Sequence, residues 1–194
     1  MEVWTEKYMA RSIFELLDQY DVGFVSSTGF MGDIPRRKAE ERMKETEEEY
    51  GIKPVIIFIS DYDAEGEYIV ECVKEEIVSA HVEKIALTKQ QVKELNFISN
   101  IGYKEKMLKP KTLKNHLSKE YVKEFIKENR DLEPNGIVQY ELDQIETKYL
   151  HSLLKGTLRK YIDMKLIEQH KELCEREVKD WMKKNYKGDM RMEP

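Results

Sequence analysis

The sequence predicts an α/β protein with a parallel sheet flanked by helices and a helical C-terminal extension. Strand-like and helix-like segments alternate over residues 1–95, which is typical of a doubly wound parallel sheet with helices on both faces. Val55–Ile59 is a continuous β-branched and aromatic run, the composition of a strand buried on both faces. From Glu146 onward, apolar residues recur at the spacing of an amphipathic helix. We therefore expect a domain over residues 1–95, then a basic linker and a mainly helical extension over residues 96–194.

Local patterns define each element of the first domain. The expected strands are residues 1–5, 22–26, 55–59 and 81–87. The expected helices are residues 9–20, 36–50 and 66–79, and Thr88 is a candidate N-cap for a further helix beginning at Lys89. Residues 27–35 contain two glycines and a proline, which favours a loop.

The second half of the chain is less regular. Residues 96–110 show no periodicity, whereas residues 119–129 have helical spacing. Residues 136–142 are one more strand candidate. The sequence of this half therefore predicts helices and a single additional strand.

Composition limits the classes of protein to consider. The formal net charge is −5 with 37% charged residues, which argues against nucleic-acid binding over the whole surface and leaves only local basic patches. Cys72 and Cys174 are far apart and share no metal-ligand spacing, so a zinc site or a disulfide framework is not expected. The longest apolar run is too short to span a bilayer, and the first residues lack a signal sequence. We expect a cytoplasmic protein without membrane contact.

An acidic cluster follows the buried strand directly. Its sequence is Asp61-Tyr62-Asp63-Ala64-Glu65-Gly66-Glu67. The carboxyl ends of parallel strands face the crevice in which ligands bind, and two aspartates two residues apart in extended chain project to the same side. Four neighbouring acids repel one another unless a positive charge lies among them. Mg²⁺ would supply that charge, with Mn²⁺ as a substitute, because it prefers oxygen ligands and binds through one or two carboxylates.

Three other kinds of site share parts of this acidic pattern. An Asp-x-Asp after a strand also occurs in solvated turns. An EF-hand loop requires Glu at its twelfth position, where this chain has Cys72, and a helix rather than a strand before it. A haloacid-dehalogenase-type phosphatase requires a nearby Thr and a second acidic pair downstream, and the sequence has neither.

The cluster resembles the DxDxEGE motif of type IA topoisomerases. That motif belongs to the Toprim domain, a Rossmann-like fold shared by topoisomerases, bacterial primases and several nucleases. The family also has a Glu at the end of its first strand, matched here by Glu6, and a glycine turn after its second strand, matched by Thr28-Gly29-Phe30. Residues 85–92 and 140–145 are similar to segments that follow the Toprim core in relatives of the topoisomerase VI A subunit and in stand-alone or phage Toprim proteins.

The resemblance implies a Mg²⁺-dependent site that cleaves phosphodiester bonds. Asp61 and Asp63 would bind the metal together with Glu65, and Glu6 would be a further ligand or a general acid or base. Glu67 ranks below Glu65, because a carboxylate at this position also favours the start of a helix. DNA is the expected substrate, with RNA as the alternative.

Three functions remain open. Topoisomerases carry a nucleophilic tyrosine in a separate domain, for which there is no room before Glu6, so a complete topoisomerase is not expected. The chain is then a nuclease or nickase, a Toprim domain or subunit of a topoisomerase- or primase-like machine, or a non-catalytic nucleic-acid-binding module. A homodimer or a partner subunit is compatible with each.

A basic segment is the candidate nucleic-acid contact. Residues 103–130 carry a net charge of +5 in a chain that is acidic overall. Such a segment is either a solvated surface or an arm that follows the phosphate backbone without reading sequence. The residues expected to contact nucleic acid are Lys7, Lys109, Lys111 and Lys114.

Overall fold

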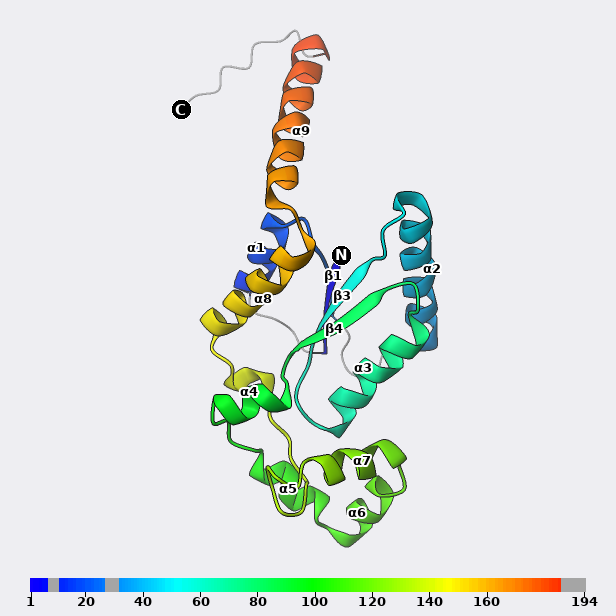
Figure 1. Cartoon of the computed structure of the whole chain (residues 1–194), viewed down its shortest axis with the longest axis vertical. Coiled ribbons are helices and arrows are strands. Elements are labelled where there is room, and N and C mark those ends of the chain that lie inside the picture. The colour runs from blue at the N-terminus through cyan, green and yellow to red at the C-terminus, as the bar shows by residue number, and fades with distance from the viewer. Residues whose placement is uncertain (7–10, 27–31, 186–194) are drawn as a thin grey trace. The chain divides into compact units, whose positions relative to one another are not determined.

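The structure, a computed structural model, describes residues 1–6, 11–26 and 32–185 (Figure 1). The chain divides into two compact units, Met1–Leu154 and Lys155–Pro194. The first unit is an α/β fold with an all-parallel sheet flanked by helices, which confirms the predicted class at this level. The expected division after residue 95 stays a prediction.

Four parallel strands form the sheet. They are β1 (Glu2–Thr5), β2 (Gly23–Ser26), β3 (Val55–Ile59) and β4 (His81–Ala86), in the order β2-β1-β3-β4. All four correspond to predicted strands. Thr5 pairs with Ile59, so β1 and β3 end level with one another. The residues that follow these two strands therefore emerge side by side at the carboxyl edge of the sheet.

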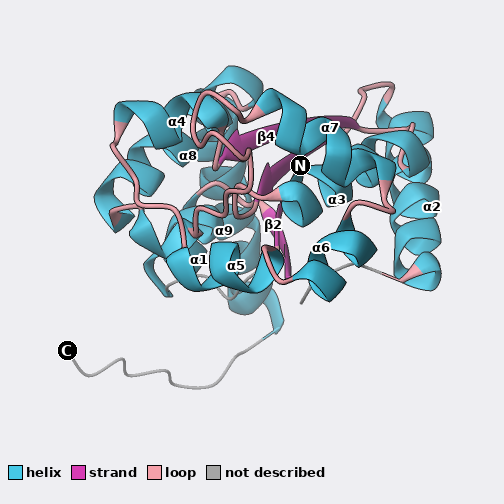
Figure 2. Cartoon of the chain, turned by 90° about the horizontal axis from the view of Figure 1, so that it is seen from below, coloured by secondary structure: helices cyan, strands magenta, loops and turns pink. Residues whose placement is uncertain are grey.

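Both faces of β3 are buried, as its apolar run predicts. Ile56 and Phe58 pack into a core with residues of α2 (Asp33–Tyr50) and α3 (Ala64–Glu76). Ile57 and Ile59 alternate to the opposite face and have no exposed surface either. Helix α1 (Arg11–Gln19) lies on the other side of the sheet from α2 and α3 (Figure 2).

The first residues of two helices can be compared with the predicted boundaries. Helix α2 begins at Asp33, so the predicted loop over residues 27–35 is too long at its C-terminal end. Pro35 is compatible with the first turn of a helix because the N–H groups there have no intrahelical acceptor. Helix α4 (Lys89–Glu94) begins as expected: the Thr88 hydroxyl accepts a hydrogen bond from the Gln91 N–H, and the Gln91 side chain accepts one from the Thr88 N–H.

The second half of the first unit is more helical than its sequence pattern indicates. It contains α5 (Ile101–Met107), α6 (Pro110–His116) and α7 (Glu120–Glu128). Residues 96–110 were expected to be irregular, which is wrong over α5, whose start is capped by the Asn100 side chain.

The predicted strand over residues 136–142 is also wrong. That segment forms one antiparallel bridge between Tyr140 and Tyr62, followed by a 3-10 turn over Leu142–Gln144. Its apolar residues are buried as a strand's would be, but its polar groups bond to loops and side chains instead of to a neighbouring strand.

Two helices close the described chain, α8 (Thr147–Tyr161) and α9 (Met164–Asn185). Leu150, Leu154 and Leu158 of α8 are buried, which confirms the amphipathic pattern that begins after Glu146. Helix α9 has no buried residue. None of the helices described here is long and apolar enough to cross a membrane.

Candidate functional site at the carboxyl edge of the sheet

The acidic cluster lies where β3 ends and α3 begins. Asp61 and Asp63 are 8% and 7% exposed, low values for carboxylates. Burial of a carboxylate is costly unless it is hydrogen-bonded or paired with a positive charge. The partners of these two side chains therefore decide what the site can do.

Asp63 is the N-cap of α3. Its Oδ1 accepts a hydrogen bond from the Gly66 N–H at 2.8 Å, and its Oδ2 accepts one from Gln139 Nε2 at 2.7 Å. A Cβ at residue 66 would lie 2.7 Å from the Asp61 carbonyl oxygen. Gly66 is thus required for the close approach of two backbone segments.

Asp61 is held by a distant segment. Its Oδ1 accepts a hydrogen bond from the Leu142 N–H at 2.7 Å. Between the two aspartates, Tyr62 and Tyr140 exchange backbone hydrogen bonds at 2.9 and 3.0 Å. We call residues 61–63 the acidic loop and residues 139–142 the 139–142 segment. The segment bonds to each of the three residues of the acidic loop.

The 139–142 segment is itself fixed from the other side. The Asn100 side chain donates to Gln139 Oε1 at 3.2 Å and to Glu141 Oε1 at 2.8 Å. The Tyr62 hydroxyl donates to Asn129 Oδ1 at 2.8 Å, and Asn129 is completely buried. These bonds orient both aspartates before any ligand binds.

Lys84 of β4 supplies a cation inside the acidic cluster. Its Nζ lies 2.6 Å from Glu67 Oε1 and 3.0 Å from the Asp61 carbonyl oxygen, and its side chain is 7% exposed. The same Nζ lies 5.8 Å from the centroid of the Tyr62 ring. Glu67 is also in the first turn of α3, the position predicted for it.

Glu65 faces the helices that follow the sheet. Its Oε1 lies 3.9 Å from Lys119 Nζ. Burial raises the pKa of Tyr103 well above its usual range, and the negative charges of Glu65 and Asp63 raise it further. Tyr103 is in α5 and Lys119 directly precedes α7, so the region from α5 to α7 lies next to Asp63 and Glu65.

Glu6 directly follows β1. Because Thr5 and Ile59 are paired, Glu6 stands level with Ser60, one residue before Asp61. Lys7, the neighbouring predicted nucleic-acid contact, lies outside the described residues. Within residues 1–6, 11–26 and 32–185, no three His, Cys, Asp or Glu side chains form a group that could hold a metal ion.

The chemistry of the donors still suits Mg²⁺. Repulsion among the acids no longer requires a metal, because backbone N–H groups, Gln139, Lys84 and Lys119 already compensate them. A hydrogen-bonded carboxylate oxygen nevertheless keeps a free lone pair, and metal-ligating carboxylates are usually hydrogen-bonded in this way. Mg²⁺ commonly takes one or two protein carboxylates and completes its shell with water and phosphate. Asp61 and Asp63 would be those ligands.

The predicted basic contacts lie in and beside α6. Lys109 precedes α6, and Lys111 and Lys114 are within it, all exposed. Other lysines of the basic segment form ion pairs, with Lys104 to Glu133 and Lys123 to Glu120 both at 2.6 Å. In the part of the chain that the structure describes, no carboxylate pairs with the three lysines of the α6 region.

The chain matches no protein-family model, no curated protein and no solved structure. The resemblance to the Toprim domain therefore stays an expectation from the motif.

Two site residues were missed in the sequence. Gln139 is separated from Asp63 by 76 positions and Lys84 from Glu67 by 17, and neither belongs to a local motif. Gln139 directly precedes residues 140–145, the segment that resembles one following the Toprim core, but it is not part of that segment. No local motif in the sequence distinguishes Lys84 from the other lysines of the chain.

Proposed function

We propose that this chain is a Mg²⁺-dependent Toprim-type nuclease or nickase that cleaves phosphodiester bonds in DNA, with RNA as the alternative substrate. The observation that carries the proposal is the shared position of Glu6 and the Asp-x-Asp pair. The parallel pairing of β1 and β3 brings them to one edge of the sheet although they are far apart in sequence. That edge is where ligands bind in open parallel α/β folds.

Each residue has a specific role in this proposal. Asp61 and Asp63 would hold Mg²⁺ through oxygens oriented by Leu142 and Gln139. Bound Mg²⁺ would neutralise phosphate charge and favour ionisation of a water nucleophile. Glu6 would accept a proton from the attacking water or donate one to the leaving oxygen.

Positive charge near this edge supports a phosphate-containing substrate. Helices α5, α6 and α7 follow the sheet and lie beyond its carboxyl edge (Figure 1). Lys109, Lys111 and Lys114 of this region would follow the backbone of the nucleic acid without reading its sequence. The net charge of −5 makes such a local patch necessary for productive encounter.

The decisive experiment incubates the pure chain with supercoiled plasmid and Mg²⁺ or Mn²⁺. Nicked or linear product is expected, and Glu6→Gln should lower the cleavage rate by about 10²–10⁴-fold, the usual contribution of a positioned acid or base. Glu48→Gln is the matched control, because Glu48 is an exposed carboxylate of α2. Equal cleavage by wild type and Glu6→Gln would refute the role of Glu6, and no cleavage by the wild type would favour a partner-dependent or non-catalytic module.

A subunit of a larger assembly is the second candidate function. Helix α9 is exposed along its length and carries large apolar side chains, of which Leu166, Val178 and Trp181 are more than half exposed. An isolated helix is only marginally stable in water unless it buries an apolar face. Light scattering tests self-association: the wild type should have the mass of a dimer, and Trp181→Glu should have the mass of a monomer.

A further inference from the structure

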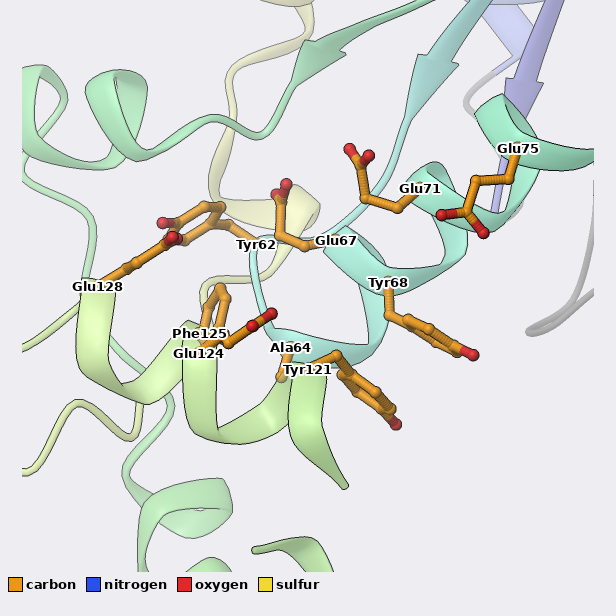
Figure 3. Close-up of a pocket in the computed structure, with 10 residues that line it drawn as sticks. All are labelled: Tyr62, Ala64, Glu67, Tyr68, Glu71, Glu75, Tyr121, Glu124, Phe125 and Glu128. Atoms are coloured by element: carbon orange, nitrogen blue, oxygen red, sulfur yellow. The ribbon is translucent and has the colours of Figure 1, made fainter. Parts of the chain in front are cut away.

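A cavity lies between α3 and α7, next to the loop that precedes α3. It measures about 480 Å³ and is lined by residues of α3, of α7 and of the loop that connects β3 to α3 (Figure 3). This volume is within the range of about 300–1,000 Å³ that is typical of small-molecule sites. The cavity shares only Tyr62, Ala64 and Glu67 with the acidic motif.

Aromatic rings form one part of the wall. Tyr68 of α3 and Tyr121 of α7 stack with their centroids 4.0 Å apart and their planes at 8°. Phe125 and Tyr62 contact one another deeper in the wall, at a centroid distance of 5.3 Å. Aromatic faces attract cations, and desolvated sites strengthen that attraction. Two lysines of the protein already use these rings: Lys84 over Tyr62 and, at 5.5 Å, Lys119 over Tyr121.

Carboxylates form the other part of the wall. Glu67, Glu71 and Glu75 follow one another at four-residue spacing on α3, and Glu124 and Glu128 have the same spacing on α7. Glu67 pairs with Lys84 at 2.6 Å and Glu71 with Lys74 at 2.7 Å. Among the described residues, no lysine or arginine forms an ion pair with the remaining three, which are Glu75, Glu124 and Glu128.

The two acidic rows have a stability cost that a bound cation would remove. Like charges four residues apart destabilise a helix, and here both helices direct such pairs into one cavity. Residues four apart stand about 6 Å from one another along a helix axis. Ammonium groups separated by three or four methylene groups in an extended chain are also about 5–6 Å apart. Methylene groups between the charges would contact the aromatic rings.

We propose that the cavity between α3 and α7 binds a linear aliphatic polyamine. Its ammonium groups pair with Glu75, Glu124 and Glu128, and its alkyl segments lie against Tyr68 and Tyr121. A hydrated metal ion satisfies the carboxylates but makes no use of the rings. This inference is independent of phosphodiester cleavage, since it concerns binding to residues outside the Glu6 and Asp-x-Asp set.

Calorimetric titration with spermine tests the proposal. Wild type should bind, and the triple variant Glu75→Gln, Glu124→Gln, Glu128→Gln should bind about tenfold more weakly, because three exposed ion pairs together are worth about that factor. The matched control changes three exposed carboxylates of α2, namely Glu45→Gln, Glu48→Gln and Glu49→Gln, and should bind as wild type does. Equal weakening in both triple variants would show attraction to net charge alone and would overturn the proposal.

Two further measurements test whether the aromatic rings contribute to binding and whether the bound cation is a polyamine or a lysine-rich peptide. Tyr68→Leu should weaken spermine binding while it leaves the carboxylates in place. Hexalysine should bind more weakly than spermine, since its charges are carried on separate side chains. Tighter binding of hexalysine, or binding of Mg²⁺ that spermine does not displace at matched ionic strength, would overturn the proposal. The single variants Glu75→Gln and Glu124→Gln repeat the test if the triple variant does not fold.

Discussion

Asp63 allows the structural and catalytic roles of the acidic loop to be separated. We predict that Asp63→Ala lowers the free energy of unfolding by about 3–5 kcal/mol. Loss of the N-cap of α3 contributes about 1 kcal/mol. Loss of the charged acceptor for Gln139, at 2.7 Å, contributes about 1.5–3 kcal/mol. A smaller part comes from the negative charge at the start of the helix, about 0.3–1 kcal/mol.

Asp63→Asn should behave differently. Asn is as good an N-cap as Asp, so the bond from the Gly66 N–H is kept. The charged acceptor for Gln139 and the negative charge at the start of α3 are lost. We expect a loss of about 1–2 kcal/mol, whereas a metal site would lose a ligand in both variants. Urea unfolding, extrapolated linearly to water, measures the difference.

Two outcomes would contradict this reasoning about Asp63. Equal destabilisation by Ala and Asn would show that the cap is not used. A change below about 0.5 kcal/mol for Asp63→Ala, the size usual for an exposed residue, would show that neither hydrogen bond contributes. Glu48→Ala on the exposed face of α2 serves as the control.

Three further predictions concern other parts of the chain. Gly136→Ala should destabilise the fold by more than about 2 kcal/mol in urea unfolding, because φ is +67° and the added Cβ would lie 2.0 Å from the Ile126 carbonyl oxygen; a neutral result would contradict the backbone geometry. Replacing three exposed lysines in and beside α6 with Gln (Lys109, Lys111 and Lys114) should weaken DNA binding for all sequences alike and flatten its salt dependence. An unchanged salt slope would show that these lysines form a solvated surface without contact to DNA. Burial raises the pKa of Tyr62 and Tyr103 in the folded state above the unfolded value of about 10. The contribution of these two tyrosines to the free energy of unfolding is therefore constant below about pH 10 and falls as the pH rises above that value. Ultraviolet absorbance titration should show these tyrosines ionising only as the protein unfolds, and a single early transition for all tyrosines would contradict their burial.

Local sequence patterns were sufficient to predict the strands of the sheet and the position of the candidate site at its carboxyl edge. Val55–Ile59 is apolar throughout because both of its faces are buried, and that composition is visible without any partner. The Thr88 cap was also predictable, because its acceptor and donor lie within three residues. Alternation of strands and helices then implied parallel pairing, and with it the meeting of Glu6 and Asp61 at one edge.

The tertiary structure decided how the acidic loop is compensated. Leu142 and Gln139 bind the two aspartates across 81 and 76 positions, and a local pattern carries no information about partners so distant. The same contacts explain why residues 136–142 are not a strand, since their polar groups are used by the acidic loop. Only the packing of α3 against α7 creates the cavity lined by aromatic and acidic side chains, because each helix alone shows no more than charged residues at four-residue spacing.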